Sequence, residues 1–192
     1  MARPREFDET DVIDRAMRQF WSHGYEATSV DDLCSATGLN RSSLYRTFGS
    51  KRDLLDTALA AYERNAIHRI EGLLEDHPIR EGLRRFLLGL FHGGSAGTAH
   101  WGCLIGNCAS ELAARDPRAQ MRLWQCLHRI EGVLRDAIAR AQRNGELTAQ
   151  IDPTSLAQFL MTQAQGLRLV AKTKPPRHVL ENIVATTLSI LN

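Results

Sequence analysis

The sequence predicts an all-α protein, with a small three-helix unit at the N-terminus and a larger helical bundle after it. Apolar residues recur three and four positions apart along most of the 192 residues, as on one face of an α-helix. No stretch alternates apolar and polar residues for more than a few positions, so no β-strand is expected. Capping residues before the periodic stretches, and Gly or Pro after them, mark where each helix begins and ends.

Three short helices are expected at the N-terminus. Acidic residues in the first turn suit the start of the first helix, because the helix dipole favours anions there. Thr28 and Ser29 precede the second helix, with Asp32 where a capping box usually has Glu. Asn40 is a good N-cap for the third helix. The predicted helices run over residues 8–22, with His23 and Gly24 at the end; from Val30 to a stop at Gly38; and from Arg41 to Phe48, closed by Gly49.

The rest of the chain reads as longer helices separated by clear breaks. A long helix is predicted from Ser50 to about residue 75, where His77-Pro78 would end it. The Gly-rich segment 92–102 is expected to be a loop. The remaining helices are predicted over residues 79–91, 103–114, 117–143, 153–170 and 177–191. We therefore expect a first domain of residues 1–52, a linking helix over about 51–76, and a second domain of residues 77–192.

The composition is that of a globular protein. The chain is 43% hydrophobic and 24% charged, with a net charge of +2. No run of about 18 apolar residues predicts a transmembrane helix, and no apolar stretch follows the N-terminal arginines to make a secretion signal. The four cysteines lie at irregular spacing that suggests no disulfide framework. The sequence thus predicts reduced thiols and a cytoplasmic location.

The third helix carries the strongest functional signal. No acidic residue occurs from Gly38 to Arg52, while hydroxyls, a tyrosine and cations gather there. A short helix packed on its predecessor by Leu44 and Phe48 would present this polar side to the major groove of DNA. Arginine pairs with guanine, serine contacts several bases, and lysine contacts phosphate. The residues expected to reach DNA are Arg41, Ser42, Ser43, Tyr45, Arg46 and Lys51.

The run from Phe7 through Tyr62 resembles the N-terminal domain of TetR-type transcriptional regulators. The matching positions are Ala16, Phe20, Gly24-Tyr25, Thr28-Ser29-Val30, Gly38-Leu39, Ser43-Leu44-Tyr45, Phe48, Ser50-Lys51 and Leu54-Leu55. The resemblance implies a helix-turn-helix DNA-binding domain in a homodimer that represses transcription until a small molecule binds its C-terminal domain. It also implies that Ser42, Ser43, Tyr45 and Arg46 read DNA, that Lys51 clamps a phosphate, and that Thr28 and Ser29 touch the DNA backbone. Arg3 and Arg5 would reach a groove from an N-terminal arm.

The same resemblance assigns effector binding and dimerisation to the C-terminal bundle. An apolar pocket between helices is the expected effector site. The residues predicted to line it are Phe86, Leu90, Trp101, Cys103, Leu104, Trp124, Leu127, His128, Phe159 and Gln163. The last two helices carry more apolar surface than a small bundle needs, which favours a dimer interface there.

The segment from Gly102 to Glu111 suggests a thiol switch. Gly102-Cys103, Asn107 and Glu111 resemble a stretch found in a subset of TetR-type regulators, in some of which the cysteine senses electrophiles or oxidants. A cysteine at a helix start has a stabilised thiolate, which raises its reactivity. The alternative is that Cys103 packs as a small buried hydrophobe. Cys108 lies five residues on and points away from Cys103 on a regular helix, so no easy disulfide is expected.

Other functions fit the sequence less well. A metal-responsive regulator would use His100, Cys103 and Cys108 with His92 or Cys126, but this spacing matches no zinc signature. We expect no enzyme and no cofactor, because no catalytic ordering or phosphate-cradling loop appears. A helical protein-interaction adaptor is the other alternative, against which the basic third helix argues. The sequence leaves open the effector, the operator, the regulated genes and whether the protein represses or activates.

Overall fold

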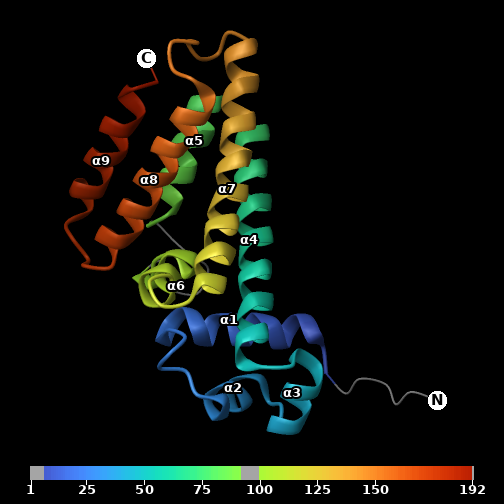
Figure 1. The fold of residues 1–192 in the computed structure, drawn as a ribbon. Coiled ribbons are helices and arrows are strands. Elements are labelled where there is room, and N and C mark those ends of the chain that lie inside the picture. The colour runs from blue at the N-terminus through green and yellow to red at the C-terminus, as the bar shows by residue number, and fades with distance from the viewer. Residues whose placement is uncertain (1–6, 92–99, 192) are drawn as a thin grey trace. The chain divides into compact units, whose positions relative to one another are not determined.

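A computed structural model describes residues 7–91 and 100–191, and within these ranges the chain forms nine α-helices and no β-strand (Figure 1). They are α1 (Glu9–His23), α2 (Val30–Thr37), α3 (Arg41–Phe48), α4 (Lys51–Glu75), α5 (Ile79–Gly89), α6 (Leu104–Leu112), α7 (Pro117–Arg143), α8 (Pro153–Ala171) and α9 (Arg177–Ser189). The predicted all-α fold is confirmed, and helix boundaries lie within a few residues of those expected.

The first three helices begin and end at local signals. Each has an N-cap side chain that accepts a backbone N–H of the first turn, and Ser29 forms the predicted capping box with Asp32. After each helix a glycine adopts a positive φ, which a residue with a Cβ rarely does. The N-caps are Asp8, Ser29 and Asn40, and the glycines are Gly24, Gly38 and Gly49.

The chain divides into two compact units. The first contains residues Met1–Arg64 and Asn107–Cys126, and the second contains Asn65–Gly106 and Leu127–Asn192. This division crosses α4, α6 and α7 and so differs from the predicted domains, 1–52 and 77–192. Residues 107–126, called here the 107–126 segment, join the N-terminal helices because their side chains contact the α1–α2 turn and the first half of α4.

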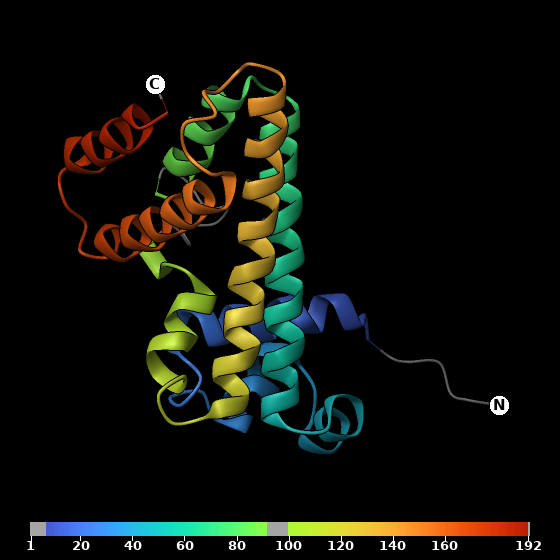
Figure 2. The same cartoon turned by 45° about the horizontal axis from the view of Figure 1, so that its top comes forward.

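The core of the first unit fixes the orientation of α3. α2 contacts both α1 and α3, and Figure 2 shows the three short helices gathered around the start of α4. Leu44 is the buried residue of α3 and has no exposed surface, while Phe48 is half-buried. Leu33 and Leu39, which precede α3 in the chain, are also buried. One side of α3 is therefore anchored, and the opposite side remains at the surface.

The second unit is a helical bundle in which α9 packs on α5 and α8. Leucines and valines at helical spacing bury the contacts between these helices, among them Leu83, Leu87, Leu160, Leu180 and Val184. Over the described residues, none of the helices combines the length and the apolar character that a membrane span requires.

Candidate nucleic-acid interface

The polar side of α3 is exposed as predicted. Tyr45 leaves 43% of its surface accessible, which is unusual for a large aromatic residue in a unit with a well-packed core. Arg41, Ser42 and Arg46 are exposed, and Ser43 is half-buried. α3 thus presents one cationic, hydroxyl-bearing surface, named here the exposed face of α3 and made up of Arg41, Ser42, Ser43, Tyr45 and Arg46.

The N-cap of α3 organises the two serines. The Asn40 side-chain oxygen accepts the Ser43 backbone N–H at 2.8 Å and the Ser42 hydroxyl at 2.8 Å. Arg46 then donates to the Ser43 hydroxyl oxygen at 3.4 Å. Because the donor hydrogen of Ser42 is directed at Asn40, its oxygen lone pairs are left to accept from an external donor.

Arg41 is held by an acid of the preceding helix. Its Nε and Nη2 atoms donate to the two carboxylate oxygens of Asp31, each at 2.8 Å. The hydrogen bonds and the charge of Arg41 keep the pKa of Asp31 below its ordinary value. Both side chains are largely exposed, so the pair can open at little cost. Arg41 must leave Asp31, or share its guanidinium, to contact DNA.

Lys51 stands at the start of α4 over the ring of Tyr25. Its Nζ atom lies 4.2 Å from the ring centroid, a cation–π distance. The Tyr25 ring is partly buried, which raises the pKa of its hydroxyl. Ser50 caps the helix by accepting the Asp53 N–H at 3.1 Å. Lys51 is thus the first residue of α4, and a helix N-terminus is where anions bind.

The side-chain hydroxyls of Thr28 and Ser29 both form hydrogen bonds within the protein. Thr28 has no exposed surface, and its hydroxyl donates to the Gly24 carbonyl at 2.6 Å. We therefore correct the predicted contact of Thr28 with the DNA backbone: this residue closes the α1–α2 turn. The Ser29 hydroxyl donates to Asp32 at 2.6 Å as part of the capping box. Arg3 and Arg5 lie outside the described residues.

The 107–126 segment makes a group of contacts that no sequence pattern predicts. Glu111 accepts the backbone N–H groups of Tyr25 and Glu26, and Arg52 pairs with Asp116 at 2.6 Å. Arg118 reaches both Asp53 and Asp56 at 3.1 and 3.0 Å. No local pattern links positions more than sixty residues apart, so only the fold reveals these contacts.

The residues predicted to line the effector pocket, called here the predicted wall, do not all lie around one buried pocket. Trp124 is 61% exposed and belongs to the first unit, and His128 is also exposed, so we correct their assignment to a buried pocket. Of the other predicted wall residues, Phe86, Leu90, Cys103 and Leu104 are buried, and Trp101, Leu127, Phe159 and Gln163 are half-buried.

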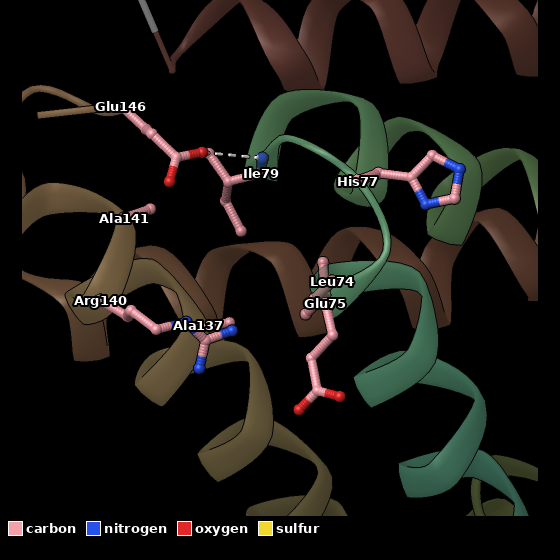
Figure 3. A pocket seen from close by; sticks show the side chains of 8 residues that line it. All are labelled: Leu74, Glu75, His77, Ile79, Ala137, Arg140, Ala141 and Glu146. Carbon is pink, nitrogen blue, oxygen red and sulfur yellow. Dashed lines mark hydrogen bonds between the residues drawn. The ribbon is translucent and has the colours of Figure 1, made fainter. Parts of the chain in front are cut away.

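A pocket of about 380 Å³ lies elsewhere in the second unit (Figure 3). Charged side chains ring it, and Glu146 accepts the Ile79 backbone N–H at 3.3 Å. Its lining consists of Leu74, Glu75, His77, Ile79, Ala137, Arg140, Ala141 and Glu146, none of which belongs to the predicted wall. The pocket is thus polar, unlike the apolar site that the sequence suggested.

The cysteines are mostly buried. Cys103, Cys108 and Cys126 expose 6%, 1% and 0% of their surface, and Cys34 is half-buried. No disulfide joins any of the four. Within residues 7–91 and 100–191, no three His, Cys, Asp or Glu side chains are arranged to hold a metal ion. His92, one of the predicted alternative ligands, lies outside these ranges.

Comparison with known proteins identifies the family. Residues 12–58 match the model of bacterial regulatory proteins of the tetR family, and residues 81–186 match that of the tetracyclin repressor-like C-terminal domain. The chain is 31% identical to the HTH-type transcriptional repressor ComR of Escherichia coli (strain K12), covering 98% of this chain and 90% of ComR. It is also 31% identical to the uncharacterized HTH-type transcriptional regulator YezE of Bacillus subtilis (strain 168), over the full length of both.

Solved structures agree with this assignment. A cysteine mutant of the TetR family transcriptional regulator CifR, in complex with a 26 bp double-stranded operator DNA, matches with a TM-score of 0.84 and 30% identity over 100% of both chains. The reduced form of E. coli NemR shows the same fold, with a TM-score of 0.84 at 19% identity over 95% of this chain and 96% of NemR. Proteins of this kind are DNA-binding regulators and not enzymes. The chain therefore belongs to the TetR family of bacterial regulatory proteins.

Proposed function

We propose that this protein is a transcriptional repressor that binds operator DNA as a homodimer through α3. The observation that carries this proposal is the exposed face of α3, a cationic surface with an exposed tyrosine on a helix whose other side is anchored by Leu44. A helix held in this way fits the major groove. The operator complex of the CifR mutant supports the proposal, since that protein is 30% identical to this chain over its full length.

Each residue of the interface has a role that its geometry favours. Tyr45 and Arg46 lie one position apart on the outer side of α3 and reach base edges and the adjacent phosphates. Ser42 and Ser43 accept or donate hydrogen bonds at close range. Lys51 contacts a phosphate at the start of α4, and Arg41 joins once it is released from Asp31. Ser29 approaches the backbone at the start of α2.

The homodimer follows from the geometry of DNA and from exposed apolar residues on the last two helices. A palindromic operator presents two half-sites about one helical turn, roughly 34 to 36 Å, apart. One copy of α3 reads one half-site, so two copies are needed. Leu169 of α8 is 68% exposed and Ile190, just after α9, is 39% exposed, which fits a surface that a second copy covers.

The release signal is a small molecule bound in the second unit or a modification of Cys103. Cys103 belongs to the second unit and immediately precedes α6. Its burial means that a reagent reaches it only when the surrounding helices open, so a small, uncharged electrophile or oxidant is the fitting class. The protein acts in the cytoplasm, where its operator lies.

The DNA assignment is tested by selecting duplexes from a random pool with the purified protein and titrating the selected duplex by fluorescence anisotropy. Tyr45→Ala and Lys51→Ala should each weaken binding by about tenfold or more, because each removes a direct contact worth roughly 1 to 3 kcal/mol. Lys172→Ala, which removes an exposed lysine of the second unit, is the matched control and should bind as wild type does. Wild-type affinity in both interface variants would refute the assignment.

The thiol route is tested separately by titrating the same duplex before and after treatment with oxidant. Loss of binding in the wild type, absent in Cys103→Ser and paired with a mass shift on the Cys103 peptide, is the expected result. Release that persists unchanged in Cys103→Ser would remove Cys103 as the switch, since the oxidant would then act at another group.

A further inference from the structure

One acidic side chain of the 107–126 segment accepts hydrogen bonds from the turn between α1 and α2. The Glu111 carboxylate accepts the Tyr25 backbone N–H at 2.9 Å and the Glu26 backbone N–H at 2.8 Å. Figure 2 shows the end of α6 beside the loop that joins α1 and α2. Hydrogen bonds from two backbone donors to one ionised carboxylate are stronger than neutral ones and fix the turn in two places.

The absence of a side chain at Gly24 allows this contact. Its φ is 89°, and a Cβ added there would lie 3.1 Å from one Glu111 oxygen and 3.3 Å from the other. A side chain at this position would therefore push the carboxylate away as well as strain the backbone. Because Gly24 has no side chain, the Glu111 carboxylate can approach the backbone N–H groups of the next two residues.

The remaining bonds of the turn are internal. The Gly24 N–H donates to the Phe20 carbonyl at 2.9 Å, and the Thr28 hydroxyl donates to the Gly24 carbonyl at 2.6 Å. The Thr28 N–H donates to the Tyr25 carbonyl at 3.3 Å. The N–H groups of Tyr25 and Glu26, by contrast, find their acceptor 86 and 85 residues away in sequence.

Tyr25 connects this turn to the cationic start of α4. The Lys51 Nζ atom stands 4.2 Å above the Tyr25 ring centroid, and the Arg52 Cζ atom is 5.9 Å from the same centroid. Arg52 in turn donates to Asp116 at 2.6 Å. The 107–126 segment therefore holds both sides of the contact: Glu111 fixes the backbone that carries the ring, and Asp116 fixes the residue next to Lys51.

We propose that Glu111 is a positioning residue for DNA binding, which holds Tyr25 so that its ring fixes the Lys51 ammonium group for a backbone phosphate. This inference rests on the proposed function, because it assigns Lys51 to phosphate. The inference predicts a change in DNA affinity that is opposite to the one expected from charge alone. An acid near the cations of the interface should weaken DNA binding by repulsion, so its removal should strengthen binding if only its charge mattered. If Glu111 positions Lys51, its removal weakens binding instead.

The experiment compares Glu111→Gln and Glu111→Ala with wild type on the wild-type-selected duplex, by fluorescence anisotropy at several salt concentrations. Glu111→Ala should bind about tenfold more weakly, and its log–log salt slope should fall by roughly 0.9, the change expected for one lost phosphate contact. Glu111→Gln should lose less affinity, because its amide oxygen still accepts one N–H. Glu71→Gln removes the same charge from an exposed position of the second unit and should leave the affinity unchanged.

A double-mutant cycle separates positioning from a general loss of fold. If Glu111 acts through Lys51, Glu111→Ala should change the affinity of Lys51→Ala by less than about twofold. Amide hydrogen exchange gives a second readout: the Tyr25 and Glu26 N–H groups should exchange faster in Glu111→Ala, while amides of the α1 core keep their protection. Affinity losses that multiply independently, or unchanged exchange at Tyr25 and Glu26, would overturn the inference.

The outcomes distinguish this inference from the proposed function. A wild-type protein that selects no duplex from the pool would overturn both. A wild-type protein that binds tightly, with Tyr45→Ala impaired and Glu111→Ala binding as wild type or better, would leave the repressor assignment in place and remove only the role of Glu111.

Discussion

Two regions of the first unit are held in place by contacts of very different range. The exposed face of α3 depends on near neighbours: Asn40 caps the serines, and Arg41 pairs with Asp31 ten residues away. The α1–α2 turn and the start of α4 depend on Glu111 and Asp116, which lie more than sixty residues further along the chain. The contacts of the first region join residues that are close in sequence. Those of the second region form only when distant segments of the chain fold together.

Under the proposed function, this difference separates the residues that contact DNA from those that orient them. Each local cap stabilises its helix by about 1 kcal/mol. Long-range bonds from the 107–126 segment hold the α1–α2 turn and the start of α4 within the first unit. A substitution that removes one of these bonds therefore changes the surroundings of Lys51 without altering any residue of α3.

The largest expected effect comes from a glycine of the long-range region. Gly24→Ala should destabilise the protein by about 3 kcal/mol, because the new side chain is strained at a φ of 89° and meets the Glu111 carboxylate at 3.1 Å. The free energy of unfolding, measured with denaturant and circular dichroism, checks this.

Gly38→Ala is the matched control from the local region. Gly38 also has a positive φ, 76°, but a Cβ there would meet nothing within 4 Å. It should cost about 1 kcal/mol, the backbone strain alone. Equal losses in the two variants would show that the Glu111 contact adds nothing to the stability of the turn.

Sequence patterns predict the caps and the exposed face of α3 well, because the contacts that form this region join residues close together in the chain. Caps at Ser29 and Asn40, glycine stops and the acid-free run to Arg52 are all encoded within a few residues, and the structure places them as expected. Trp124 shows the opposite case: its apolar ring suggested a buried wall, but tertiary packing leaves it exposed. The sequence indicates Glu111 only as part of a motif, because its hydrogen-bond partners are brought to it by folding and not by spacing along the chain.

A smaller effect, of opposite sign, is expected at the local ion pair. Asp31→Asn should strengthen binding of the selected duplex by about threefold, because it frees the Arg41 guanidinium and removes an anion near the phosphates. The salt dependence of binding should become steeper, since one more cation meets the DNA. Anisotropy titrations at two or more salt concentrations measure both changes.

Asp136→Asn supplies the control for this variant. It breaks an exposed pair with Arg135 in the second unit, at 2.9 Å, and should not alter DNA binding. Weaker binding by Asp31→Asn would mean that Asp31 orients Arg41 for the groove instead of competing with DNA. In that case the local region would contain a positioning acid of its own.

The smallest expected effect is on thermal stability, and its dependence on pH is confined to acid. The hydroxyl and backbone N–H of Ser29 lower the pKa of Asp32, and the backbone N–H of Ala119 and then the charge of Arg52 lower the pKa of Asp116. Because both folded-state pKa values lie below the ordinary value of 3.8, these carboxylates stabilise the fold fully above that pH. Their contribution is lost as the pH falls through the lowered pKa values, and between pH 5 and 8 they cause no change.

Thermal unfolding followed from pH 7 to pH 2 compares one acid from each region. Asp32→Asn and Asp116→Asn should each lower the unfolding midpoint at pH 7 by about 2 °C, a modest shift because both groups are open to solvent. Both curves should converge with wild type as the pH falls through the lowered pKa values, where the wild-type carboxylates become protonated as well. If the Asp116 curve stays apart from wild type in acid, the amide fails as a hydrogen-bond acceptor for Arg52 and Ala119, and the long-range contact depends on geometry as much as on charge.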